Sequence, residues 1–275
     1  MTDRSRTMLM EEFPVLGAVD TTCHLGQWPF RLPASAAVDD LRDYARWYGL
    51  RSLWVSHLAS LFGFDTRTGN EAVFAACGDD PLFRVFAVID PRQSDWRQEL
   101  AWAALSGAAG IRVAPGYHRY PVSLLTQVVD ACAELELPLQ LLTRLDDARV
   151  RHPLSPAEDL EPHHLADLIR ARPAHPMLLS GLNHADWQEV SRHLGDDAPS
   201  AVRLDLWHVN GPTHVADGLA RDPGRWVFGS GYPVQTPEAT MLQLAASALS
   251  GDVRGKVCSG NAVAMLAGTA TSLGT

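Results

Sequence analysis

Several kinds of motif are missing from this 275-residue chain, and each absence argues against a class of protein. Its four cysteines (Cys23, Cys77, Cys132 and Cys258) show no CxxC spacing, so we expect free thiols and no zinc knuckle. No GxGxxG follows the first predicted strand and no GxxxxGK[ST] occurs, which argues against the common nucleotide-binding folds. No apolar run reaches the roughly 20 residues of a membrane span, and the first residues lack a signal peptide pattern, so we expect a cytoplasmic protein without a membrane partner.

Positive charge is also scarce. The chain has 23 Lys and Arg against 32 Asp and Glu, which gives a net charge of −9. Nucleic acids and anionic membranes select proteins with clustered Lys and Arg, so neither is an expected partner. A small organic substrate fits this composition better.

The length and the apolar content of 46% are enough for one barrel-sized domain or for two smaller domains. No linker or low-complexity tract divides the chain, and no internal repeat is visible. The sequence therefore predicts a single domain over residues 1–275, with an N-terminal extension at 1–14 and a C-terminal tail at 269–275. Assembly into a homo-oligomer is left open.

Short apolar runs alternate with segments of helical periodicity along the chain. The predicted strands are Ala18–Cys23, Leu53–His57, Val85–Ile89, Ile111–Ala114, Leu139–Thr143, Met177–Ser180, Val202–Leu206 and Trp226–Phe228. The predicted helices are Ala36–Tyr48, Asn70–Cys77, Trp96–Ser106, Ser123–Glu136, His163–Arg170, Ala185–His193, Thr213–Ala220 and Pro237–Leu249. Eight alternating units predict an α/β fold of the (β/α)8 TIM barrel type, with a doubly wound sheet as the alternative, and place the chemistry at the C-terminal ends of the strands.

Four motifs at predicted strand ends carry a resemblance to a known family. They are Val19-Asp20-Thr21-Thr22-Cys23-His24-Leu25-Gly26, Gly110-Ile111-Arg112-Val113-Ala114-Pro115, Phe228-Gly229-Ser230-Gly231-Tyr232-Pro233 and Gly260-Asn261-Ala262. From about Leu16 to Ala267 the chain resembles the amidohydrolase-related family of metal-dependent TIM barrels. The resemblance implies a hydrolase or decarboxylase of small carboxylates, lactones or amides.

The resemblance fails at the positions that bind the metal in that family. Thr22 replaces the first histidine of the first strand and His24 remains, while Leu142, Gly181 and Gly231 stand at the other ligand positions. A catalytic divalent ion needs about three protein ligands, so we expect no metal cofactor. A relocated zinc site is the alternative, built from strand-end histidines, namely His57, His118, His152, His184 and His208.

Two further runs resemble an uncharacterised branch of the same family. They are Leu25-Gly26-Gln27-Trp28-Pro29-Phe30-Arg31 and Arg144-Leu145-Asp146-Asp147-Ala148-Arg149-Val150-Arg151-His152-Pro153. They support membership but name no substrate.

The remaining strand-end residues predict a site that works without a metal. Side chains alternate along a strand, so Thr22 and His24 should face the barrel interior, and Arg144 should face the mouth. A guanidinium binds a carboxylate through two parallel hydrogen bonds, which favours a carboxylate substrate, although Arg144 could instead pair with Asp147. The predicted substrate-binding residues are Arg144, Arg31, Trp28, Tyr117, Trp207, Thr22, Gly181 and Gly231, and the predicted acid–base residues are His24, His118 and Asp205.

Two functions remain open at this point. The first is a metal-independent hydrolase or lyase in which cationic groups stabilise developing negative charge. The second is a catalytically silent barrel that serves as a binding protein or a partner subunit. An enzyme should keep a pocket with convergent polar groups at the mouth, and glycines at 181 and 231 are expected to leave room for one.

Overall fold

The computed structural model describes residues 3–31, 35–63, 65–155, 157–195, 198–209 and 212–270. Within them lies a sheet with the strand order β2-β1-β3-β4-β5-β6-β7-β8-β9, in which every neighbouring pair is parallel except β1 and β2. The strands are β1 (Val19–Gln27), β2 (Ser35–Ala36), β3 (Ser52–His57), β4 (Phe83–Val88), β5 (Gly110–Val113), β6 (Leu139–Leu142), β7 (Met177–Ser180), β8 (Val202–Asp205) and β9 (Trp226–Val227).

The sheet closes on itself through the residues that follow β9. The Thr21 amide donates to the Phe228 carbonyl at 3.0 Å, and the His24 amide donates to the Tyr232 carbonyl at 2.8 Å. These bonds join β1 to the far end of the sheet, so β1 and β3 to β9 form an eight-stranded parallel barrel. The predicted fold class is confirmed, while β2 is a short antiparallel addition that the sequence analysis missed.

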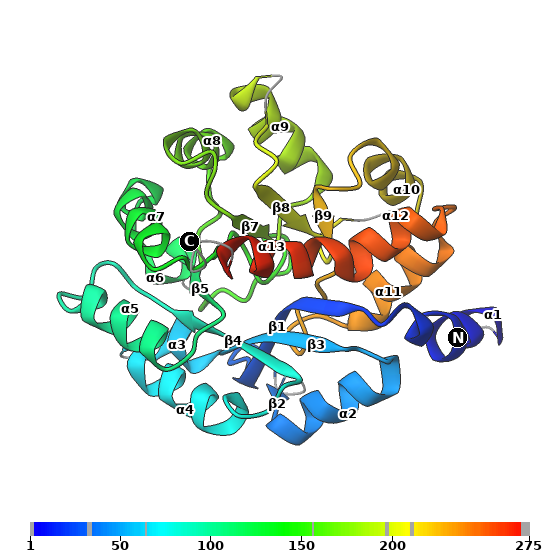
Figure 1. The fold of residues 1–275 in the computed structure, drawn as a ribbon, viewed down its shortest axis with the longest axis horizontal. Coiled ribbons are helices and arrows are strands. Elements are labelled where there is room, and N and C mark those ends of the chain that lie inside the picture. Colours follow the sequence, from blue (N-terminus) through cyan, green and yellow to red (C-terminus); the bar gives the residue numbers. More distant parts are fainter. Residues whose placement is uncertain are drawn as a thin grey trace.

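Helices surround the barrel, as Figure 1 shows, and each of the eight predicted helices is present with small differences at its ends. Those eight are α2 (Val38–Tyr48), α4 (Arg67–Cys77), α5 (Trp96–Leu105), α7 (Leu125–Glu134), α8 (Pro162–Ala171), α9 (His184–Leu194), α10 (Pro212–Arg221) and α11 (Pro237–Ala246). The sequence analysis did not predict four short helices, α1 (Asp3–Thr7), α3 (Ala59–Phe62), α6 (Pro115–His118) and α12 (Gly251–Gly255). It also did not predict the longer helix α13 (Asn261–Ala270). Turns of 3-10 or π helix occupy Met8–Glu12, Pro14–Leu16, Val122–Leu124 and Lys256–Gly260.

The strands are buried on both faces because helices cover the outside and side chains fill the inside, as parallel sheets require. Helix α13 lies across the end of the barrel where the strands begin, which is visible in Figure 1. Its Ala262 and Met265 belong to one buried cluster with Val19 and Trp54 from the first residues of β1 and β3. This end of the barrel is therefore filled and covered.

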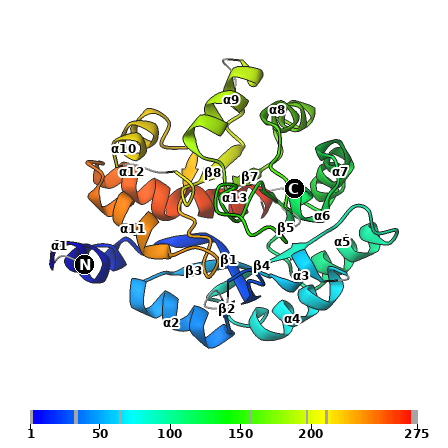
Figure 2. The same cartoon turned by 180° about the vertical axis from the view of Figure 1, so that it is seen from behind.

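The predicted N-terminal extension and C-terminal tail are partly described. Leu9 and Phe13, within 1–14, are buried, and the Phe13 ring lies 5.3 Å from that of Phe228. Residues 269 and 270 belong to α13, and residues 271–275 lie outside the described residues. The π-helical turn Met8–Glu12, which follows α1, packs against α11 from the last quarter of the chain, and Figure 2 shows this N-terminal segment on the α11 side of the barrel. No helix in the described part of the chain is both long and apolar enough to cross a membrane.

A second buried apolar cluster fills the opposite end of the barrel, where the strands end. We call it the mouth cluster, and it consists of Trp28, Leu58, Leu61, Val88, Ala114, Tyr117, Leu142, Leu145, Trp207 and Val234. Its aromatic rings pack edge to face, with Trp28 at 5.2 Å from Phe62 and 6.3 Å from Tyr117. The mouth cluster separates the inside of the barrel from solvent at this end.

Candidate active site

Polar side chains occupy the middle of the barrel, beneath the mouth cluster. We call this group the interior network, and it consists of Thr22, His24, Ser56, Arg112, Gln140, Ser180 and Asp205, each at most 1% exposed. Arg112, on β5, is its cation. Gln140, on β6, connects it to Thr22 because the Gln140 amide accepts from Arg112 Nε at 2.9 Å and donates to Thr22 Oγ1 at 2.9 Å.

Asp205, at the end of β8, is the anion of the interior network. Its carboxylate accepts hydrogen bonds from Thr22 Oγ1 at 2.7 Å and from the Gly181 amide at 3.1 Å. Burial raises the pKa of the Asp205 carboxyl from 3.8 to about 6, against the opposing effect of its hydrogen bonds to Ser180, Thr22 and Gly181. At neutral pH this carboxylate is therefore charged at a cost in free energy.

This cost predicts a pH dependence of stability. A carboxyl that holds its proton more tightly in the folded state contributes stability below its unfolded pKa and loses it as pH rises through the folded pKa, here from about 4 to about 6. A shift of about two pKa units corresponds to about 3 kcal/mol. In the wild type, the Asp205 carboxyl should therefore make the free energy of unfolding fall as the pH rises from 4 to 7. In Asp205→Asn this contribution to the fall should be absent. Urea unfolding of both proteins across this range tests it, and identical pH profiles would contradict it.

His24 is fixed inside the same network. Its Nδ1 lies 3.3 Å from Ser56 Oγ and 3.5 Å from an Arg112 nitrogen, and its Nε2 has no hydrogen-bond partner among the described residues. Burial, then the charge of Arg112, lowers the pKa of His24 well below its usual value. His24 is thus a neutral, buried imidazole beside a fixed cation.

The residues at the family's ligand positions do not fit a metal ion. His24 is next to a guanidinium, Leu142 belongs to the mouth cluster, and Thr22 already bonds Asp205. The described residues contain no group of three or more His, Cys, Asp or Glu side chains arranged to hold an ion. The histidines considered for a relocated zinc site are among these described residues.

Gly181 and Gly231 do not leave room for a substrate, and that expectation is wrong. Both have positive φ, at 92° and 70°, which only glycine adopts readily. A Cβ on Gly181 would lie 2.4 Å from the Arg144 carbonyl oxygen, and a Cβ on Gly231 would lie 2.3 Å from the Trp207 ring. Glycine stands there because other parts of the chain pack closely against the backbone.

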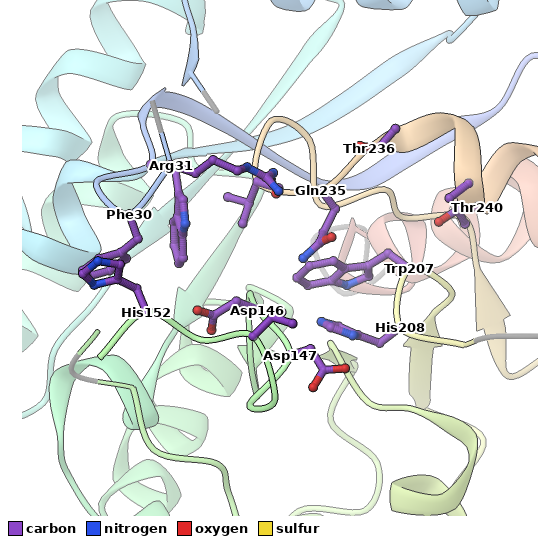
Figure 3. A pocket seen from close by; sticks show the side chains of 14 residues that line it. Phe30, Arg31, Asp146, Asp147, His152, Trp207, His208, Gln235, Thr236 and Thr240 are labelled. Atoms are coloured by element: carbon purple, nitrogen blue, oxygen red, sulfur yellow. The ribbon is translucent and has the colours of Figure 1, made fainter. Parts of the chain in front are cut away.

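An open cavity lies above the mouth cluster, at the C-terminal ends of the strands, and Figure 3 shows it from close by. We call it the mouth pocket. Its volume is about 360 Å³. Its lining comes from the segments after β1, β6, β8 and β9 and from α11, and consists of Trp28, Phe30, Arg31, Asp146, Asp147, Val150, His152, Trp207, His208, Val234, Gln235, Thr236, Ala239 and Thr240. Trp28, Trp207 and Val234 belong also to the mouth cluster, so they form the boundary between pocket and barrel.

Two adjacent residues bring unsatisfied polar atoms to the mouth pocket. Trp207 Nε1 and His208 Nε2 are buried and make no hydrogen bond among the described residues, and the two rings lie 4.5 Å apart. Burial, then the charge of Arg144, lowers the pKa of His208 to about 4, so the ring is neutral at pH 7. In Figure 3 the His208 ring lies between Trp207 and Asp147. A buried polar atom without a partner costs free energy, which a bound molecule can recover.

The two aspartates of the pocket are held by arginines. Asp146 accepts from Arg151 Nε at 3.1 Å and from the Tyr117 hydroxyl at 3.1 Å, while Asp147 pairs with Arg149 at 2.5 Å. Their charges are therefore compensated locally. Arg31, on the opposite wall, donates a hydrogen bond to the Val234 carbonyl.

The predicted site residues thus fall into three places. Trp28, Arg31 and Trp207 line the mouth pocket, and Tyr117 supports it from the mouth cluster. Thr22, His24 and Asp205 lie together, but in the interior network. The others lie elsewhere: Arg144 pairs with Asp186 of α9 at 2.9 Å and not with Asp147, and His118 donates to the Ser60 carbonyl at 3.0 Å.

Sequence reasoning missed several pocket residues and the cation of the interior. His208 and His152 were noted as strand-end histidines, but nothing in their spacing distinguished them from loop histidines. Arg112 carried a usable signal, because Ile111 and Val113 on either side of it are apolar and face the helices, which turns Arg112 inward. Gln235 and Thr240 carried none, since they reach the pocket only through the path of the chain after β9.

Comparisons with known proteins agree with this fold. Residues 56–267, more than half of the chain, match the family model described as Amidohydrolase. No curated protein matches the chain.

Solved structures of similar fold include an uncharacterised TIM-barrel protein from Bordetella bronchiseptica, with 16% identity over 92% of this chain and 99% of that one, at a TM-score of 0.69. The 2,6-dihydroxybenzoate decarboxylase from Rhizobium is 16% identical over 91% and 98%, at a TM-score of 0.69. The dihydroxybenzoic acid decarboxylase from Polaromonas sp. JS666, whose structure contains manganese and the inhibitor 2-nitroresorcinol, is 15% identical over 91% and 97%, at a TM-score of 0.69. The resemblance inferred from the sequence is confirmed, and the chain belongs to the amidohydrolase family.

Proposed function

We propose that this protein is a metal-independent hydrolase or lyase that binds a small aromatic carboxylate in the mouth pocket. One observation supports this most: the cavity of about 360 Å³ at the C-terminal strand ends contains a neutral histidine, His208, whose buried Nε2 has no partner among the described residues. Enzymes with this fold place their reactions at that end of the barrel. The interior network is the less suitable place because it is buried and its groups bond mainly to each other.

The walls of the pocket suggest the shape and charge of the substrate. Trp28, Phe30 and Trp207 offer flat aromatic surfaces, which favour a planar ring. Arg31 faces the same space from the opposite wall and can bind a carboxylate, a role for which the sequence suggested Arg144 first and Arg31 as a further candidate. The carboxylate ligands of related decarboxylases are consistent with this class, since one of those structures contains 2,6-dihydroxybenzoate.

His208 would carry the acid–base chemistry. A neutral imidazole can accept a proton from a substrate hydroxyl or from an attacking water molecule. The charges of Asp147 and Asp159 would then stabilise the imidazolium, since both favour the protonated form of His208. In hydrolysis or decarboxylation, the Arg31 guanidinium would stabilise negative charge on the substrate.

The first test of this proposal is binding. A thermal shift screen of aromatic carboxylates would identify the best ligand of the wild type, and calorimetry would measure its affinity. Arg31→Ala should make the binding free energy of this ligand less favourable by about 1.5–3 kcal/mol, the range for a hydrogen bond to a charged group. Arg31→Lys should recover only part of the affinity because it loses the bidentate geometry. Arg46→Ala, on the exposed face of α2, is the matched control and should bind like the wild type. Equal affinity of all three variants would show that the ligand does not reach Arg31.

A second candidate function is ligand binding without catalysis. It is favoured by the mouth cluster, which covers the part of the barrel where the family's metal ligands would stand. The two functions differ in one result. If a ligand binds the pocket, and if this ligand and all its close analogues are recovered unchanged after long incubation, the result would support binding without catalysis.

A further inference from the structure

We infer that Arg112 is the resident cation of the barrel interior, in the place where other barrels of this type use a metal ion. This inference is independent of the proposed function of the mouth pocket. It depends on the burial of Arg112, on the acceptors around its guanidinium and on the residues that replace the metal ligands.

The guanidinium of Arg112 is fully bonded. An arginine has five N–H groups, and each of them has an acceptor here although the side chain is fully buried. The acceptors are Gln140 Oε1 at 2.9 Å, Ser56 Oγ at 2.5 Å and the carbonyl oxygens of Cys23 at 3.0 Å, Thr21 at 3.3 Å and Trp54 at 3.3 Å. These oxygens come from β1, β3 and β6, so one side chain of β5 ties three other strands together.

The positive charge also has a buried counterpart. Arg112 is connected to Asp205 through Gln140 and Thr22, so the anion on β8 and the cation on β5 are linked by two neutral side chains. The two charges are not in direct contact, but each is a buried counter-charge of the other, and removing a buried counter-charge destabilises the folded state. Loss of this cation is therefore expected to destabilise the fold around Asp205.

The surroundings of His24 do not favour a divalent ion. An Arg112 nitrogen lies 3.5 Å from His24 Nδ1, the one retained histidine of the ligand set, so a bound ion would stand beside a fixed positive charge. Gly229 behind the site offers no side chain, and a Cβ there would already lie 2.8 Å from Asp205. Among the described residues, no group of three or more His, Cys, Asp or Glu side chains surrounds His24 to complete a ligand set beside this guanidinium.

The test is chemical rescue of a variant that lacks the guanidinium. Arg112→Ala should lower the melting temperature by about 10 °C or more, because it leaves Asp205 and five oxygen acceptors without their cation. Refolding this variant in millimolar ethylguanidinium should restore several degrees, whereas ethylammonium should restore less and Mn²⁺ or Zn²⁺ should restore nothing. The wild type should respond to none of the four. Rescue by a metal, or equal stability of variant and wild type, would overturn the inference.

Arg112→Lys keeps the test decisive if the alanine variant fails to fold. Lysine retains the charge but has three donors on one nitrogen in place of five on a planar fork. We expect a folded protein with a lower melting temperature than the wild type and no response to Mn²⁺ or Zn²⁺. A lysine variant as stable as the wild type would show that the bonds of the guanidinium do not matter. Stabilisation of either protein by a stoichiometric metal would show that the interior still has a metal site.

Discussion

Replacing His208 by asparagine is expected to lower turnover of the pocket's substrate by about 10²–10⁴-fold, the range for losing a general acid or base. Binding should change little, because asparagine keeps a polar group of similar size in the pocket. His24→Asn is the matched comparison, since sequence reasoning gave the catalytic role to His24. The structure places His24 in the interior network, so this variant should reduce stability but leave turnover nearly unchanged. Steady-state kinetics of the two variants with one substrate decides between the two histidines.

The pH profile of the wild type gives an independent check on His208. Its lowered pKa of about 4 keeps the ring neutral from about pH 5 upward. Turnover should therefore be flat across pH 6 to 8 and should fall below pH 5 as the ring is protonated, provided the protein remains folded. An inflection near 6.5, the usual histidine value, would show that a different histidine is involved.

Trp28→Ala should lower the free energy of unfolding by about 3–5 kcal/mol, the range for truncating a buried large aromatic side chain. Trp28 is only 4% exposed and contacts the rings of Phe30, Phe62 and Tyr117. Its loss should also open the mouth cluster and admit water to the interior network. Amide hydrogen exchange of His24, whose N–H donates to Tyr232, should therefore accelerate more than that of amides in α7.

Trp28→Phe is the conservative control for this variant. It keeps an aromatic ring against Phe62 and Tyr117, so most of the stability and the slow exchange of His24 should remain. If Trp28→Ala unfolds at the same denaturant concentration as the wild type, the mouth cluster does not seal the barrel as described.

The fold could be predicted from the sequence because local patterns determine it. The apolar run Met177–Ser180 was predicted as a strand and is β7, with the same limits. Strand ends were less certain: the run predicted to continue to Leu206 ends at Asp205, because the chain turns there toward the pocket. Local patterns do not reveal this turn.

The site could be predicted only in part because its contacts join distant segments. Alternation along the strands correctly placed Thr22 and Asp205 inside the barrel, yet it could not show that the mouth cluster covers them. Arg144 illustrates the same limit. Its partner Asp186 lies on α9, whose position relative to β6 depends on packing and not on the nearby sequence.

The closure of the barrel has a consequence for the order of events during synthesis on the ribosome. The hydroxyl of Thr21 donates to the carbonyl of Phe228 across 207 positions of the sequence. The first strand emerges early and can pair with β2 and β3, but the segment after β9 that bonds Thr21 and His24 is not made until more than four fifths of the chain exists. The part of the β1 edge around Thr21 and His24 therefore lacks its partner throughout that time. Contacts of such long range slow folding, and they make nascent chains of this protein candidates for chaperone binding until the segment after β9 arrives.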